Sequence, residues 1–162
     1  MKDFINDINF EIQALQKLLE DIQTIKAVSF EIDTRPIGQQ RHRTTYLGHN
    51  YTPKKTKEFQ SLIKWLYRAS SRHIFTGPVA LMMKFCFAVP VSTTKTETKR
   101  IVNKVYVPYP KKPDTDNVEK AILDALNKVA WNDDRQVTNV SKRKCYDKTN
   151  RIIIHIYEDK EI

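Results

Sequence analysis

The sequence predicts an α+β fold: a single domain with a mixed β-sheet of four or five strands packed by helices, preceded by an N-terminal amphipathic helix. At 162 residues the chain has the size of one domain with a proper hydrophobic core. The sequence contains both segments with strand-like alternation and segments with helical periodicity, and it has no internal repeat. Hydrophobic residues form 40% and charged residues 29% of the chain, proportions typical of globular proteins.

The first 26 residues are predicted to form an extension, with an amphipathic helix over residues 3–25, ahead of a main domain over residues 27–162. Its apolar residues follow the 3, 4 spacing of a three-heptad seam: Ile5, Ile8, Ile12, Leu15, Leu19 and Ile22. Such a seam suits pairing with a second helix in a dimer, and it equally suits packing on the chain's own domain. Both interpretations stay open.

The main domain is expected to begin with a strand and a long helix. Residues 27–33 alternate between apolar and polar side chains, which predicts a strand. Residues 36–50 are expected to form a loop or hairpin. Thr52 as N-cap and Pro53 at the first helical position then predict a helix that runs to about His73.

The centre of the chain alternates between apolar and polar stretches. Residues 78–89 are almost wholly apolar, which predicts a central strand buried on both faces. Residues 96–103 are polar and basic and suit either a short helix or a mobile loop. Residues 105–110 contain two prolines and are expected to be extended.

The C-terminal third is predicted to be a helix followed by two strands that a turn joins. Residues 115–129 place their apolar side chains on one side of a helix, where they can pack on the sheet: Val118, Ala121, Ile122, Ala125, Leu126 and Val129. Residues 137–146 and 151–158 are predicted strands, and residues 147–150 are the turn between them.

The formal net charge of +9 is concentrated in the middle of the chain. Residues 35–72 carry nine basic side chains against one acidic, whereas residues 1–26 carry three basic and five acidic. Basic patches of this kind attract phosphate backbones, although a solvated lysine-rich surface is the simpler alternative. The residues predicted to contact DNA are Arg41, Arg43, Lys54, Lys55, Lys57, Lys111 and Lys112.

Several classes of protein are not expected. No apolar run of 18 residues is present, so the sequence predicts no membrane span. The N-terminus lacks the apolar core of a signal peptide, which favours a cytoplasmic location. Cys86 and Cys145 form no CxxC motif, so we expect buried thiols and neither a disulfide framework nor a zinc site.

Acidic residues cluster within this basic chain and suggest a metal site. Asp114 and Asp116 lie one residue apart, Lys120 follows on the same helix side as Asp116, and Asp133 and Asp134 come after the helix. Carboxylate oxygens are the ligands that Mg²⁺ prefers, and such a site leaves positions for water and phosphate. A nearby lysine would add positive charge where negative charge develops on a reacting phosphate.

A structural interpretation competes with this one. Asp116 with Glu119 three residues later matches a helix capping box, and Lys120 is a plausible i, i+4 partner of Asp116. Asp133 and Asp134 are also common turn residues. Spacing alone does not decide between the two interpretations.

At these residues the chain resembles the RusA family of Holliday junction resolvases. The matching segments are residues 112–117, 120–127 and 131–137, with a weaker match at residues 41–43 and 51–56. The resemblance extends over roughly residues 27–158. Two differences are visible: the segment between the two acidic motifs is about one residue shorter than in the enterobacterial form, and residues 1–26 are additional.

The resemblance implies a homodimeric, magnesium-dependent endodeoxyribonuclease that cuts four-way DNA junctions symmetrically in recombination and repair. By the same resemblance Asp114, Asp116 and Asp134 are catalytic and hold Mg²⁺, Lys120 is needed for activity, and Asp133 is a possible accessory acid. It further implies a bacterial or phage-encoded protein that acts at the nucleoid. A looser flap or branched-DNA nuclease and a non-catalytic DNA-binding protein remain the alternatives.

Overall fold

The computed structural model describes residues 26–40, 43–44, 50–104 and 106–160, together with Gln13 and Gln16, which are helical. The predicted N-terminal seam lies outside the described residues. So do Arg41 and the side chain of Arg43, two of the predicted DNA contacts. The division of the chain at residue 26 therefore stays a prediction.

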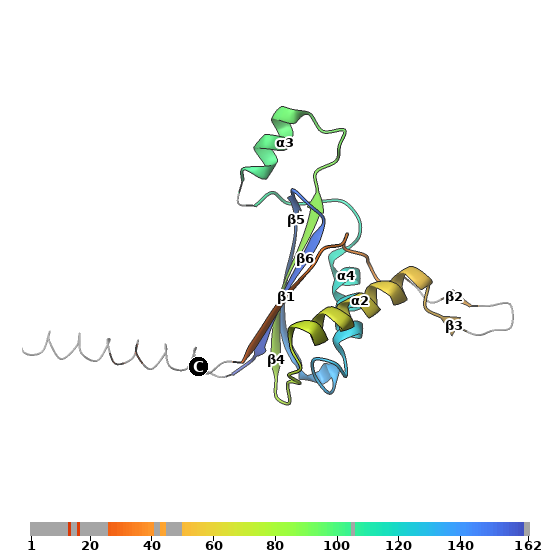
Figure 1. The fold of residues 1–162 in the computed structure, drawn as a ribbon, viewed down its shortest axis with the longest axis vertical. Coiled ribbons are helices and arrows are strands. Elements are labelled where there is room, and N and C mark those ends of the chain that lie inside the picture. Colours follow the sequence, from red (N-terminus) through yellow and green to blue (C-terminus); the bar gives the residue numbers. More distant parts are fainter. Residues whose placement is uncertain are drawn as a thin grey trace, which may run out of the picture.

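A four-stranded mixed sheet forms the centre of the protein (Figure 1). In spatial order its strands are β1 (Ala27–Ile32), β6 (Arg151–Glu158), β4 (Val79–Ala88) and β5 (Val137–Asp147). The β1–β6 and β6–β4 pairs are antiparallel, and β4 and β5 are parallel. A separate two-stranded sheet, β2 (Arg43–Thr44) with β3 (Asn50–Tyr51), lies in the predicted loop or hairpin. The predicted α+β fold with a mixed sheet is confirmed.

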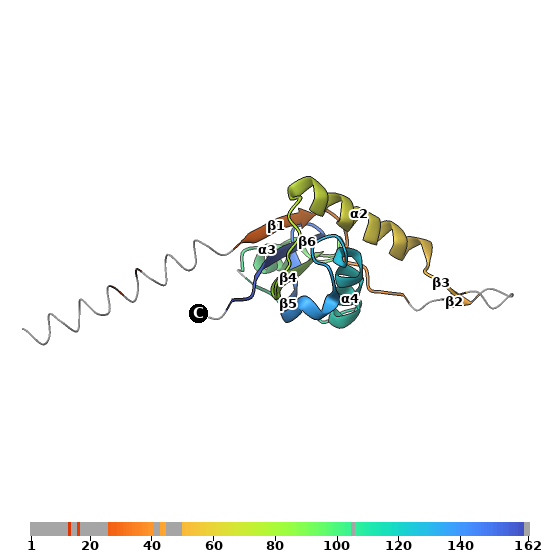
Figure 2. The same ribbon diagram turned by 90° about the horizontal axis from the view of Figure 1, so that it is seen from below.

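Two helices, α2 (Lys54–Ser70) and α4 (Thr115–Leu126), lie side by side on one face of this sheet (Figures 1 and 2). A third helix, α3 (Lys95–Val102), stands at one end of the sheet, and a short 3₁₀ helix, η1 (Asp134–Gln136), leads into β5. No helix among the described residues is long and apolar enough to cross a membrane.

The core lies between the sheet and these two helices. Alternate residues of β1 are buried there, as the period of two requires: Val28, Phe30 and Ile32. From α2 the core receives Phe59, Ile63 and Tyr67. From α4 it receives Val118, Ala121, Ile122, Ala125 and Leu126, which confirms the predicted apolar side of this helix.

The prediction that β4 is a central strand is confirmed, and its second face is buried at Ala80 and Cys86, but the predicted burial of that face is wrong in the middle of the strand. Its core face is closed, but Met82 is 46% exposed and Lys84 is half-buried on the opposite face. Because α2 and α4 cover one face only (Figure 2), Met82 stays exposed on the other face near the middle of the strand. An apolar run therefore overestimated the burial of this strand.

The helix boundaries also differ from the predicted ones. Pro53 is the cap of α2 and has ψ 144°, so helical geometry begins at Lys54, and Thr52 is not the N-cap. The helix ends at Ser70, before His73, because Ser71 is extended. Similarly α4 ends at Leu126, three residues early, because Asn127 has ψ 131°. The polar stretch over residues 96–103 is helical (α3), with Thr94 as its N-cap.

The extended segment before α4 runs along β5. The Tyr109 amide donates to the Lys144 carbonyl at 3.3 Å, and the Tyr146 amide donates to the Val107 carbonyl at 2.9 Å. Cys86 on β4 and Cys145 on β5 are buried free thiols with their sulfur atoms 3.7 Å apart. The predicted extended segment and the predicted buried thiols are both confirmed.

Candidate functional site

The first acidic pair lies at the start of α4. Asp114 is the N-cap residue, with extended geometry (ψ 146°), and Asp116 lies in the first turn. Both side chains are exposed. Within the described part of the chain the Asp114 side chain makes no capping hydrogen bond, so its carboxylate is available for other partners.

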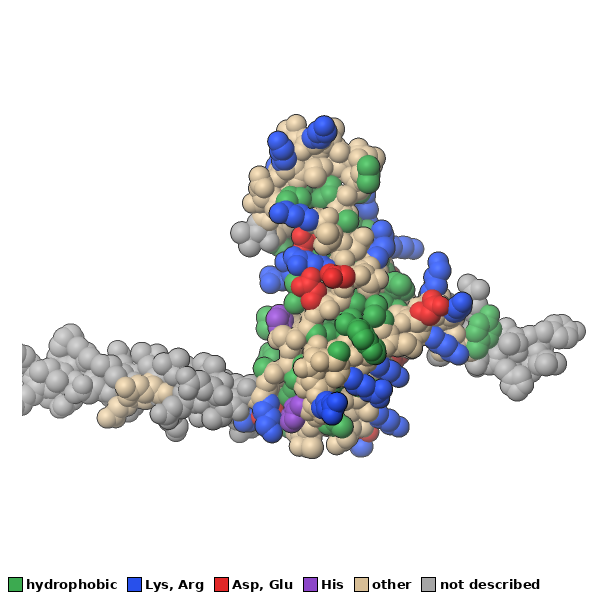
Figure 3. All heavy atoms as spheres, in the orientation of Figure 1, with side chains coloured by type: hydrophobic (Ala, Val, Ile, Leu, Met, Phe, Trp, Pro, Cys, Tyr) green, Lys and Arg blue, Asp and Glu red, His purple; other side chains and the backbone are tan. Residues whose placement is uncertain are grey.

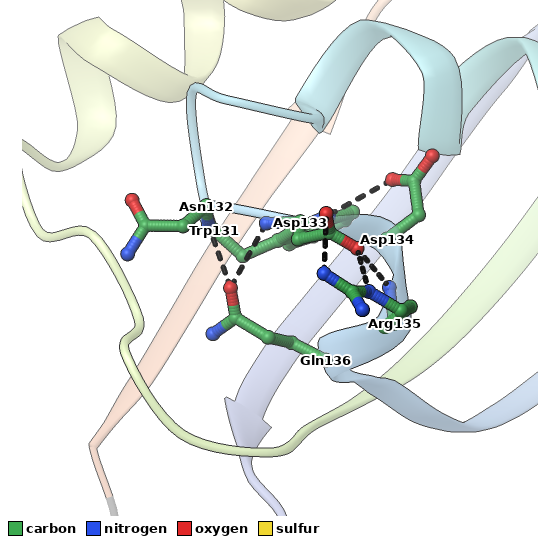
Figure 4. A network of polar contacts seen from close by, with 6 residues as sticks. All are labelled: Trp131, Asn132, Asp133, Asp134, Arg135 and Gln136. Atoms are coloured by element: carbon green, nitrogen blue, oxygen red, sulfur yellow. Dashed lines mark hydrogen bonds and ion pairs between the residues drawn. The ribbon is translucent and has the colours of Figure 1, made fainter.

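The second acidic pair divides into two different roles (Figure 4). The Asp133 carboxylate accepts from the Arg135 amide at 2.9 Å and from its guanidinium at 3.0 Å. The Gln136 side chain accepts in return from the Asp133 amide at 3.0 Å, which completes a capping box for η1. These contacts with Arg135 hold the pKa of Asp133 below its ordinary value. The turn interpretation is thus correct for Asp133.

Asp134 is oriented by a buried indole. Its Oδ1 accepts from Nε1 of Trp131 at 3.1 Å, and Trp131 is fully buried. The Asp134 side chain itself is exposed. Figure 4 shows its carboxylate turned away from Arg135, on the side where α4 passes. The indole therefore holds this carboxylate facing the helix.

A pocket of about 360 Å³ brings the two acidic motifs together. Asp116 and Lys120 of α4 line it together with Asp134 of η1. Its other lining residues are Glu119, Leu123, Asp124, Val137 and Lys142. The fold thus closes the distance between the helix start and the strand start, which the sequence spacing permitted but did not establish.

Asp114 lines a different, neighbouring groove of about 600 Å³. Lys55 and Lys112, two of the predicted DNA contacts, line this groove with it, and so does Arg35. Asn117, which follows Asp116 on α4, also faces the groove. The start of α4 therefore separates an acidic pocket from a basic groove, with one aspartate on each side.

The donor chemistry fits a hard divalent cation, since carboxylate oxygens from Asp116 and Asp134 share one pocket. Among the described residues, however, no three or more His, Cys, Asp or Glu side chains form one group that could hold a metal ion. Asp114 lies apart in its own groove. The structure thus places two residues of the predicted set in one pocket and Asp114 in the groove beside it.

Two lysines of β5 were missed by the sequence analysis. Lys142 forms an ion pair with Glu119 inside the acidic pocket. The Lys144 ammonium donates to the carbonyls of Lys111 at 2.8 Å and Pro113 at 2.9 Å. The period of two along β5 places both lysines on the α4 side of the sheet. That alternation was the signal by which the sequence could have identified them.

The ion pair of Glu119 is also evidence against the interpretation that Asp116 and Glu119 form a helix capping box. The helix cap is Asp114, two residues earlier, and Glu119 is engaged by a strand residue 23 positions later. Among the described residues no ion pair joins Asp116 with Lys120 either. Both side chains are exposed and line the same pocket, where a ligand can reach them.

The remaining predicted DNA contacts lie on exposed surfaces. Lys54 and Lys57 project from the first turns of α2, and Lys54 pairs with Glu58 at 3.7 Å. Lys111 is exposed in the segment that leads to α4. None of these side chains is buried, so their positions are compatible with contacts to a large ligand.

Comparison with known proteins identifies the family. The sequence model described as "Endodeoxyribonuclease RusA" matches residues 33–157 of this chain. The chain belongs to the RusA family. It is also similar to the uncharacterized protein YqaN of Bacillus subtilis (strain 168), with 30% identity in an alignment of 139 residues that covers 81% of this chain and 96% of the Bacillus protein. The predicted family membership is confirmed over nearly the predicted range. By this membership the chain is a RusA family endodeoxyribonuclease.

Proposed function

We propose that this protein is a magnesium-dependent nuclease that resolves four-way DNA junctions by paired cleavage. In this proposal Asp114, Asp116 and Asp134 hold the metal ion, and Lys120 contacts the scissile phosphate. One observation carries the proposal: Asp116, Lys120 and Asp134, which come from two elements, line a single solvent-accessible pocket. Family membership supports the reaction class.

The charge of the pocket gives each residue a role. Bound Mg²⁺ would supply a Lewis acid and an activated water for phosphodiester hydrolysis. Asp116 and Asp134 provide hard oxygen donors, and the Trp131 indole fixes the direction of Asp134. The exposed Lys120 ammonium, on the same pocket wall, stabilises negative charge on a phosphate that reaches the site.

The neighbouring groove provides a path for the DNA strand. Lys55, Lys112 and Arg35 surround Asp114 there, so a phosphate backbone that follows the groove arrives beside the acidic pocket. One active site cuts one strand at a time. Paired cuts in a junction therefore require two sites, which is why we propose a homodimer.

Asp116→Asn tests the catalytic part of the proposal. The substitution removes one negative charge and one metal-binding oxygen while the side-chain shape stays the same. We expect the cleavage rate of a synthetic four-way junction in Mg²⁺ to fall by more than about 100-fold, since removing even indirect supports of a metal costs 10–100-fold. Junction affinity without metal should be equal or higher, because less negative charge repels the DNA. Normal cleavage by this variant would refute the mechanism.

Asp133→Asn is the matched control, because asparagine caps a helix about as well as aspartate and Asp133 is engaged with Arg135. It should cut at close to the normal rate. The same assays on a flap and a linear duplex separate the alternatives: preference for flaps would indicate a looser nuclease. Binding without cleavage of any substrate would indicate a non-catalytic DNA-binding protein.

A further inference from the structure

A second basic site lies at the far end of α2. A hollow of about 450 Å³ is lined by Arg68, Ser71 and Arg72 from the end of α2 and by Lys128 from the turn after α4. Tyr67, Ile74 and Val129 form the rest of its wall. Three cationic side chains from segments more than 50 residues apart thus converge on one depression.

Among the described residues, no ion pair neutralises the three cations of this hollow. Arg68, Arg72 and Lys128 are all exposed. Asp133 is the acidic group near Lys128, but its carboxylate is already bound by Arg135. The hollow therefore carries a local positive charge that an anion would relieve.

Lys128 has a backbone conformation that is uncommon for a lysine. Its φ of 61° lies in the left-handed region, which glycine or asparagine adopts most readily after a helix. The position nevertheless holds a lysine, and Lys128 lines the hollow.

A row of basic residues joins this hollow to the predicted DNA-binding end of α2. Lys57, Lys64 and Arg68 are spaced seven and four residues apart, so they share one flank of the helix over about 16 Å. Trp65, 65% exposed, lies beside them on the outer surface. Figure 3 shows Lys and Arg side chains gathered next to α2 on the lower part of the molecule.

We propose that the hollow formed by Arg68, Ser71, Arg72 and Lys128 binds a backbone phosphate of a DNA arm away from the cleavage site. It lies at the end of α4 opposite Asp114, about 18 Å along the helix. At 3.4 Å per nucleotide this corresponds to about five base pairs, so the contacted phosphate is not a neighbour of the scissile one. The inference rests on the proposed nuclease function and adds a separate arm contact to it.

The test uses the full-length double variant Arg68→Gln/Lys128→Gln, with Lys148→Gln/Lys160→Gln as a control of equal charge. Junction affinity is measured without metal over a series of salt concentrations. The loss of this one phosphate contact should lower the slope of log affinity against log salt by about 0.9 and weaken binding by at least about tenfold at low salt. The control should change neither quantity by a comparable amount.

Cleavage distinguishes this proposal from the one for the active site. At saturating protein the double variant should cut a bound junction at the normal single-turnover rate, whereas Asp116→Asn should not cut. Lys128→Gly is a second variant that removes the lysine side chain without destabilising the fold, because glycine adopts the left-handed backbone readily. It should weaken binding with an equal or higher melting temperature. Affinity and salt slope equal to the control in both variants would overturn the proposal.

Discussion

Lys144→Met should loosen the segment that carries Asp114. The Lys144 ammonium reaches from β5 to the carbonyls of Lys111 and Pro113, at 2.8 and 2.9 Å, directly before the first aspartate. It also lies 5.8 Å from the centre of the Tyr109 ring. Methionine keeps most of the side-chain stem but removes the donor. The variant therefore tests whether these two hydrogen bonds position Asp114.

The magnitude follows from the two hydrogen bonds. Each has a charged donor, for which a net contribution of about 1.5–3 kcal/mol is typical. The bond to the Lys111 carbonyl is exposed and the bond to Pro113 is half-buried, which places the sum of the two at or just below its lower limit of about 3 kcal/mol. We expect the free energy of unfolding to fall by about 2–3 kcal/mol. With a urea dependence of about 2 kcal/mol per molar, the midpoint shifts by roughly 1 M.

Urea denaturation measures the stability, and single-turnover cleavage with metal-free junction binding measures the functional part. We expect the cleavage rate to fall by about tenfold or more and to recover partly at high Mg²⁺, with junction affinity changed less than about threefold. Lys144→Arg keeps the charge and the donors and should restore part of the rate. Lys148→Met, in the exposed turn between β5 and β6, removes the same charge as a control.

Two results would refute this reasoning. A urea midpoint equal to that of Lys148→Met would mean that the hydrogen bonds do not hold the segment. A loss of junction affinity with a normal cleavage rate would mean that Lys144 contacts DNA and does not position Asp114.

Two further predictions concern stability. Burial raises the pKa of Tyr67 to about 12, so the folded state favours the neutral phenol. The resulting contribution to the free energy of unfolding is fully present below pH 10 and is lost as the pH rises towards 12. Tyr67→Phe also removes the 2.6 Å hydrogen bond that the Tyr67 hydroxyl donates to the His73 carbonyl. This variant should lower the free energy of unfolding by about 1 kcal/mol at pH 8 and by less at pH 11. An equal loss at both pH values would contradict the burial argument. Asp133→Ala should lower the melting temperature by a few degrees, because it removes the cap of η1, while cleavage continues. Asp134→Ala, by contrast, should abolish cleavage. A folded but inactive Asp133→Ala variant would show that Asp133 belongs to the catalytic set.

Local periodicity was sufficient to predict the elements that depend on it. The alternation in β1 correctly identified Val28, Phe30 and Ile32 as one face, and the helical spacing in α4 identified its buried side. Both patterns arise because each element buries one face against a single core. The spacing of apolar residues within each segment therefore identifies its buried face. The apolar content of β4 gave no such information, because it does not say which face a helix covers.

The acidic motifs show where sequence reasoning stops. The capping interpretation failed for Asp116 and Glu119, whereas the turn interpretation was correct for Asp133, which caps η1. The difference is tertiary: Lys142 on β5 engages Glu119, whereas the partners of Asp133 lie within three residues. A cap formed by neighbours is readable from sequence, and an ion pair from a strand 23 residues away is not.

The position of Asp134 is set by an anchor and not by the number of residues after α4. Trp131 is fully buried, and its backbone forms bridges to Phe75 and Asn127. Its indole then donates to Asp134, three residues later. A change of one residue in the segment between Asp116 and Trp131 can be absorbed in the turn that contains the left-handed Lys128, because the indole still fixes the acid. The shorter return from the first acidic motif is therefore compatible with a shared pocket for Asp116 and Asp134.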